Sequence, residues 1–157
     1  MEKYLLTDSI LSYMREKFLY DIYEEDYSLF EQSIEKEESV IVDETRRNLS
    51  FVMQEEVDVE YYKEKFRNPL KPDKKIFDTI CSMVNKNENF NFLHREVLFG
   101  MPTPIPFVIA TAFVKHIPII VDEADKDYLR YQKICPSYHI EIYKKTQYLR
   151  ALKGKNI

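Results

Sequence analysis

Tryptophan is absent from this sequence and glycine is nearly so. Only Gly100 and Gly154 occur among its 157 residues. A loop that cradles phosphate needs several glycines close together, so the sequence excludes Walker-type nucleotide sites and the classical dinucleotide-binding site. The shortage also disfavours an all-β fold, because tight hairpin turns rely on glycine.

Cysteine and unbroken apolar stretches are scarce as well. Cys81 and Cys135 form no CxxC pair and each lies in an apolar run, which favours buried thiols in a reducing compartment. The apolar stretch 107–121 is interrupted by Lys115 and Pro118, so it does not reach membrane-spanning length. The sequence opens with charges and shows no signal peptide. We expect a cytoplasmic protein that does not enter a membrane.

The composition is that of a folded protein. Hydrophobic residues make up 45% of the chain and charged residues 32%. That balance is typical of globular proteins, and the length suits one domain with a real core. We therefore expect residues 1–157 to form a single domain.

The net charge of −4 hides an uneven distribution. Residues 16–44 hold eleven acids against two lysines, whereas residues 144–157 hold five bases and no acid. Such a split can guide a polyanion to one face, and the acidic 16–44 face is a natural docking surface for a basic partner. The alternative is that both stretches are simply solvated.

Strand-like and helix-like segments alternate along the chain. Strands are predicted at residues 3–7, 38–42, 117–121 and 138–143, the last as an outer strand. Helices are predicted at 10–19, 26–34, 44–53, 76–84, 94–99, 107–113, 125–133 and 146–152. Residues 55–75 are charged, with a helix that later prolines end. Strand–helix crossovers favour a parallel sheet, so we predict a three-layer α/β/α fold with a central, mainly parallel sheet.

The first strand ends in a carboxylate. Residues 3–9 read KYLLTDS, so a buried strand runs directly into Asp8 and then into an apolar-periodic helix. Open α/β sheets bind ligands at the carboxyl ends of their strands. The alternative is that Asp8 or Ser9 only caps the helix that follows.

Several segments, in a fixed order, carry a resemblance to a known family. In the second half these are the helix at 104–115, the strand at 117–122, and the segments 133–135, 139–142 and 148–150. In the first half they are YLLTDS at 4–9 and VIVDE at 40–44 with the helix after it. Together they resemble PIN domains over nearly the whole chain. The unmatched residues 55–100 then form a less typical, charged helical insertion.

The resemblance implies a chemistry. PIN domains are metal-dependent ribonucleases, often the toxin of a toxin–antitoxin pair. Three or four carboxylates in such a site hold one or two Mg²⁺ or Mn²⁺ ions, because hard cations prefer oxygen ligands and can activate water beside the scissile phosphate.

The family's acids carry over unevenly. The first matches Asp8. The second, a glutamate before a leucine, is Asn48 here, and Glu44 lies about one turn earlier on the same helix face. The third is Ile105. The fourth falls in the stretch 122–125, where Ala124 stands on the direct alignment and neighbouring acids can replace it.

Two functions follow from this pattern. The first is an atypical endoribonuclease whose catalytic and metal-binding residues are Asp8, Glu44, Asp122 and Asp125. The second is a catalytically inactive PIN-fold module that binds RNA or a protein partner, such as an antitoxin or a complex subunit, through the acidic 16–44 face. A homodimer is compatible with either.

Simpler roles exist for most of these residues. Asp43 and Glu44 can form the acidic first turn of a helix, and so can the acids at 122–127. The three histidines show no metal-binding spacing. Lys144 and Lys145 can either contact phosphate or remain solvated.

Overall fold

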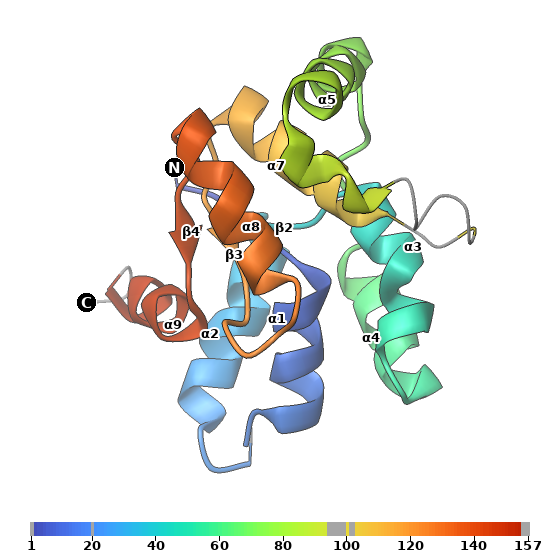
Figure 1. Cartoon of the computed structure of the whole chain (residues 1–157). Coiled ribbons are helices and arrows are strands. Elements are labelled where there is room, and N and C mark those ends of the chain that lie inside the picture. Colours follow the sequence, from blue (N-terminus) through green and yellow to red (C-terminus); the bar gives the residue numbers. More distant parts are fainter. Residues whose placement is uncertain (1, 20, 94–99, 101–102, 155–157) are drawn as a thin grey trace.

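The computed structural model describes residues 2–19, 21–93, 100 and 103–154. Its centre is a four-stranded, all-parallel sheet in the order β2-β1-β3-β4, with helices on both faces (Figure 1). The strands are β1 (Tyr4–Leu6), β2 (Ser39–Val40), β3 (Ile119–Ile120) and β4 (Ile142–Tyr143). The predicted α/β class with a parallel central sheet is confirmed.

Helices connect the strands and pack around them. They are α1 (Asp8–Ser12), α2 (Glu24–Glu35), α3 (Asp43–Val52), α4 (Glu56–Lys65), α5 (Lys74–Lys86), α7 (Pro104–Lys115), α8 (Tyr128–Ile134) and α9 (Lys145–Gly154). A π-helix, η1 (Tyr13–Lys17), extends α1, and two 3₁₀-helices are η2 (Glu88–Phe90) and η3 (Cys135–Tyr138). No helix in the described part of the chain is long and apolar enough to cross a membrane.

Three local predictions need correction. Helix α7 already begins at Pro104, because proline is well accommodated in a first turn whose N–H groups need no helical partner. The outer strand is limited to Ile142–Tyr143, since η3 occupies the residues before it and His139 then turns with φ 58°. Cys81 is exposed, whereas Cys135 is buried as expected. The helix predicted at 94–99 lies outside the described residues.

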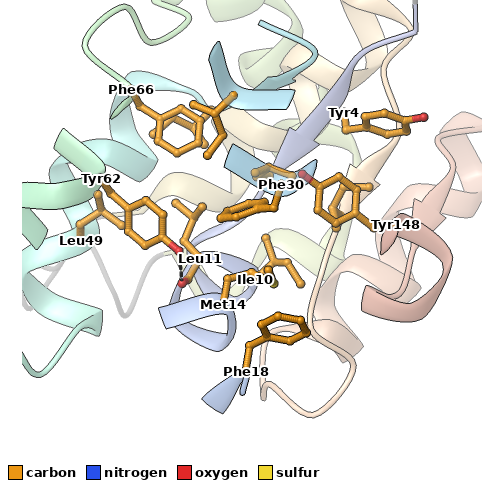
Figure 2. Packing of buried hydrophobic residues seen from close by; sticks show 14 of the residues in the cluster. Tyr4, Ile10, Leu11, Met14, Phe18, Phe30, Leu49, Tyr62, Phe66 and Tyr148 are labelled. Carbon is orange, nitrogen blue, oxygen red and sulfur yellow. Dashed lines mark hydrogen bonds between the residues drawn. The ribbon is translucent and has the colours of Figure 1, made fainter. Parts of the chain in front are cut away.

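The strand β1 separates two apolar clusters because its side chains alternate between the faces of the sheet. Tyr4 and Leu6 pack into the first cluster, with residues of α1, α2, α3, α4 and α9 (Figure 2). Leu5 packs into the second, with residues of α5, α7 and α8. All three residues are at most 1% exposed, as expected of a central parallel strand covered on both faces.

Hydrogen bonds and rings organise the first cluster. The buried hydroxyl of Tyr62 donates to the backbone carbonyl of Leu11 at 2.7 Å, so α4 is fixed against α1 (Figure 2). The Tyr148 ring packs edge-on against Tyr4, 5.5 Å between centroids, and its hydroxyl shares a hydrogen bond with Ser39. The closing helix α9 is therefore tied to both β1 and β2.

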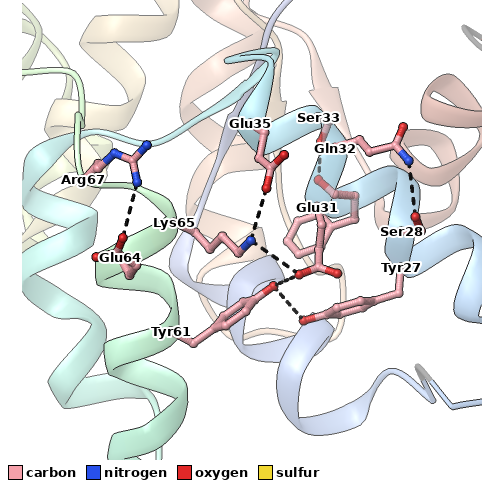
Figure 3. Close-up of polar contacts among 11 residues, drawn as sticks. Tyr27, Ser28, Glu31, Gln32, Ser33, Glu35, Tyr61, Glu64, Lys65 and Arg67 are labelled. Carbon is pink, nitrogen blue, oxygen red and sulfur yellow. Dashed lines mark hydrogen bonds and ion pairs between the residues drawn. The ribbon is translucent and has the colours of Figure 1, made fainter.

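A polar network joins α2 to α4 at the edge of this cluster. Tyr61 of α4 donates to Glu31 of α2, and Tyr27 donates to Tyr61 at 3.4 Å (Figure 3). Lys65 lies 3.8 Å from Glu31 and 3.4 Å from Glu35. Glu31 and Glu35 of the acidic 16–44 stretch therefore form intramolecular contacts with α4.

Replacing Tyr62 by phenylalanine removes the hydroxyl that donates to Leu11. We expect the free energy of unfolding to fall by about 1–3 kcal/mol, because a buried carbonyl loses a partner. Urea denaturation at neutral pH measures the change. The matched control is Tyr23→Phe, since Tyr23 is 51% exposed and should tolerate the loss. Equal effects in the two variants would contradict the assignment.

Candidate functional site at the carboxyl ends of the strands

All four parallel strands end at the same edge of the sheet, and a polar group follows each of them. Asp8 follows β1, Asp43 and Glu44 follow β2, and Asp122 follows β3. Lys145 follows β4 as the first residue of α9. This edge is where open α/β folds bind ligands, so it is the candidate site.

Small hydroxyls fix the turn between β1 and α1. Thr7 donates to the backbone carbonyl of Ile120 at 2.8 Å and shares a 3.0 Å hydrogen bond with Ser9. The Ser9 hydroxyl in turn accepts from the backbone N–H of Asp122 at 3.1 Å. The N-cap residue of α1 is Thr7, without a side-chain cap bond, so the alternative in which Asp8 or Ser9 caps this helix is wrong.

Asp8 faces an amide rather than a second carboxylate. The side-chain N–H of Asn48 donates to the Asp8 carboxylate at 2.6 Å. The pKa of Asp8 is raised to about 6, mainly by burial; the hydrogen bonds from Asn48 and the Ser9 backbone lower it, and the charges of Asp127 and Asp125 add to the rise. The structure therefore brings Asp8 within electrostatic range of Asp125 but gives its hydrogen bond to Asn48.

Asp122 is held by a lysine. It is 4% exposed, and its carboxylate accepts from the Lys145 ammonium at 3.0 Å and from the backbone N–H of Ala124 at 3.0 Å. Lys145 also lies 2.7 Å from Glu123 and 4.8 Å from the centre of the Tyr13 ring. Burial lowers the pKa of Lys145, but its bonds to Glu123 and Asp122 outweigh that and raise it. The charge of Asp122 is thus compensated within the chain.

The acids at the start of α3 behave differently from each other. Asp43 forms an ion pair with Arg47 at 2.8 Å. One carboxylate oxygen of Glu44 is buried without a hydrogen-bond partner among the described residues. Burial raises the pKa of Glu44, and the neighbouring Asp43 adds to this effect. Among the four predicted site acids, Glu44 is therefore the one with a buried carboxylate oxygen that lacks a hydrogen-bond partner in the described part of the chain.

Asp125 and Asp127 form the far side of the site. The Asp125 carboxylate accepts from the backbone N–H of Asp127 at 2.8 Å, and Asp127 lies 3.4 Å from Arg130. Within residues 2–19, 21–93, 100 and 103–154, no three histidine, cysteine, aspartate or glutamate side chains form a group that could hold a metal ion. The four predicted ligands Asp8, Glu44, Asp122 and Asp125 are near the same sheet edge but do not form such a group.

The donor set at this edge fits Mg²⁺ or Mn²⁺ poorly. A divalent cation needs several oxygen ligands, whereas Asn48 presents an N–H to Asp8 and Lys145 places a positive charge on Asp122. Ile105 is 5% exposed and belongs to the second apolar cluster, the one that contains Leu5. Its side chain packs as core and contributes no polar atom.

The sequence alone leaves Lys145 as a phosphate contact or a solvated base, whereas the structure pairs it with Asp122. The signal that could have identified it is its position, because Lys145 follows β4 by two residues just as Asp122 follows β3.

No protein-family model matches the sequence, and no curated protein matches it.

The Asp8→Asn substitution tests the electrostatics of the site. Folded Asp8 has a pKa of about 6 against an ordinary value of 3.8, so it binds a proton between these values that the unfolded chain does not hold. Its contribution to stability is therefore present below about pH 4 and lost as pH rises through about 6. We expect the stability gain of Asp8→Asn over wild type to be larger at neutral pH than at about pH 4, by on the order of 1–3 kcal/mol.

Urea titrations of both proteins across this pH range measure the difference. Asp78→Asn is the control, because Asp78 is exposed and its substitution should change stability little. A difference between Asp8→Asn and wild type that does not change with pH would contradict burial of Asp8.

The Lys145→Met substitution tests the ion pair with Asp122. It keeps the apolar stem but leaves a buried carboxylate without its cation, so we expect a loss of about 3 kcal/mol in the free energy of unfolding. Adding Asp122→Asn should recover most of the loss. Lys144→Met, one residue earlier and exposed, is the control and should be nearly neutral. A double variant no more stable than Lys145→Met would argue against the pair.

Proposed function

We propose that this chain is a PIN-like module that acts by binding a protein partner and that metal-dependent hydrolysis of RNA has been lost. The Asn48 amide on the Asp8 carboxylate carries the proposal. A second carboxylate is expected at that position from the PIN resemblance, and an amide N–H cannot serve as a metal ligand in its place.

The other strand-end groups support the same proposal. Lys145 compensates Asp122 and Glu123, and Arg47 compensates Asp43. A site prepared for a divalent cation keeps its carboxylates available, because each internal ion pair must be broken before the metal is bound. The parallel sheet with helices on both faces is the fold that the PIN resemblance implies.

Charge favours a protein partner over RNA. The basic tail is partly consumed inside the molecule, since Lys145 pairs with Asp122 and Lys153 pairs with Asp26 at 3.0 Å. The chain as a whole has a net charge of −4. Affinity for nucleic acid depends on lysine and arginine side chains that are not engaged in ion pairs and can contact phosphates. A basic protein segment complements the net negative charge of this chain better than a polyanion does.

A second candidate remains the atypical Mg²⁺- or Mn²⁺-dependent endoribonuclease of the toxin–antitoxin kind, with Asp8, Glu44, Asp122 and Asp125 as its acids. One observation favours it. The pKa of Asp8 is about 6 through burial, with Asp127 and Asp125 adding to the effect, and a cation would relieve that repulsion.

In either function we place the protein in the cytoplasm, which the two free cysteines support.

Manganese titration and RNA cleavage separate the two functions. We expect calorimetry to detect no Mn²⁺ binding by wild type or by Asp8→Asn, and neither protein to cleave a fluorescent single-stranded RNA of mixed sequence. Manganese-dependent cleavage by wild type that disappears in Asp8→Asn would overturn the proposal. Saturable RNA binding without cleavage at about 0.15 M salt would replace the protein partner by RNA.

The Asn48→Glu substitution provides a gain-of-function control for the same assay. It places a carboxylate where the amide now meets Asp8, so we expect measurable Mn²⁺ affinity. Combining it with Asp8→Asn should abolish that affinity. If Asn48→Glu gains nothing while circular dichroism shows a folded protein, Asn48 is not what prevents metal binding.

A further inference from the structure

Exposed apolar side chains gather at two turns. Nine large hydrophobic side chains are exposed in the described part of the chain. Six of them lie either between η1 and α2 or around the turn between α3 and α4: Leu19, Ile22, Tyr23, Phe51, Val52 and Val57. Ile22 is 71% exposed, Phe51 72% and Val57 69%. Single exposed apolar residues are ordinary, whereas grouped ones are the kind of feature found at interaction sites.

The two turns lie at one end of the molecule. The backbone N–H of Gln54 in the α3–α4 turn donates to the carboxylate of Glu16 in η1 at 3.1 Å. Figure 1 shows both turns at the lower edge of the view, on the side away from α5 and α7. We call the six side chains together the two-turn surface.

The two-turn surface rests on the core. Phe18 directly precedes Leu19 and is 8% exposed, and Met53 directly follows Val52 and is 6% exposed. Both pack into the first apolar cluster, the one that contains Tyr4 and Leu6. Arg15 of η1 also binds Asp58 of α4 at 2.9 Å. Anchoring of these neighbouring residues limits the conformational entropy that Leu19 and Val52 lose on binding, which favours affinity.

Strong negative charge surrounds these apolar side chains. Residues 16–25 and 51–60 contain eight acids and one lysine. Asp58 is neutralised by Arg15. The remaining seven acids are all exposed: Glu16, Asp21, Glu24, Glu25, Glu55, Glu56 and Glu60. Apolar anchors inside a charged rim are the usual anatomy of a protein interface, and the sign of the rim selects the partner.

We propose that the two-turn surface docks a basic amphipathic segment of a partner protein, with apolar side chains against Ile22, Phe51 and Val57 and with lysines or arginines toward the acids around them. This inference deepens the proposed function, because it names the surface and the partner chemistry through which a module without catalysis would act. An amphipathic helix supplies apolar and basic side chains together at the spacing that such a patch needs.

The charge argues against other occupants. Two copies of this chain joined through the two-turn surface would bring two acidic rims together, and like charges across an interface oppose association. An anionic membrane is disfavoured for the same reason. The surface is therefore assigned to a basic protein segment and not to a homodimer.

Peptide binding tests the inference with defined probes. The probe is a fluorescent two-heptad LKKLLKL peptide, and the controls are the same peptide with glutamate for lysine and with serine for leucine. We expect saturable binding of the lysine–leucine peptide only, weakening as salt rises. Ile22→Ser and Phe51→Ser should each weaken it about tenfold, the size of an interface anchor. Leu129→Ser is the matched control, since Leu129 is 61% exposed on α8, and should leave binding unchanged.

Charge variants give the second arm. Reversing Glu55 and Glu56 to lysine should weaken binding about tenfold, whereas the same reversal of Asp78 and Glu88, two exposed acids on other elements, should have little effect. Binding that is absent, or equal in all variants, overturns the inference, and so does binding of the glutamate peptide. Sedimentation that shows self-association lost in Phe51→Ser would assign the surface to a second copy instead.

The outcome is distinguishable from failure of the proposed function. The peptide experiment does not involve Asp8, Asn48 or any strand-end acid. Manganese-dependent RNA cleavage would overturn the proposed function and leave the docking inference intact. Absence of both cleavage and peptide binding would overturn only the docking inference.

Discussion

Burial of β1 on both faces is the constraint on which the rest of the structure depends. Tyr4 and Leu6 contribute to one apolar cluster and Leu5 to the other, so the three-residue strand belongs to both halves of the core. Its backbone also pairs with β2 on one side and β3 on the other. A buried backbone must have its hydrogen bonds satisfied, which fixes both neighbours beside it. The turn after β1 then places Asp8 at the middle of the sheet edge.

Within that frame, the site is decided by pairs of side chains and not by single acids. A carboxylate buried at a strand end must be protonated, paired or hydrogen-bonded. Here Asp8 accepts a hydrogen bond from the Asn48 amide and Asp122 forms an ion pair with Lys145, so both carboxylates have partners within the chain. At the turns beside η1 and α3, by contrast, large apolar side chains are exposed to solvent, and this is where we propose that a partner docks.

Much of the fold could be predicted from local pattern, because helix and strand periodicity act over a few residues. The parallel sheet, α2, α3 and α5 follow from such patterns. The π-helix at Tyr13–Lys17 has no signal in the local pattern; within it Met14 is buried and Arg15 bonds to Asp58, 43 residues away, a contact that exists only in the folded chain. The partners of the site acids were equally hidden, since Asn48 and Asp8 are 40 residues apart and their hydrogen bond exists only in the folded chain. The acids can be identified in the sequence, but the side chains that pair with them cannot.

The pairing of β1 with β3 also governs when the protein can fold during synthesis. The Thr7 hydroxyl bonds to the Ile120 carbonyl across 113 residues, so one edge of β1 has no partner until β3 has been synthesised. Until then Leu5 and Leu6 are available to other chains as an apolar strand edge. Closing so long a loop is slow for entropic reasons. Strand β1 therefore precedes β3 in synthesis and keeps one unpaired edge until β3 has been made.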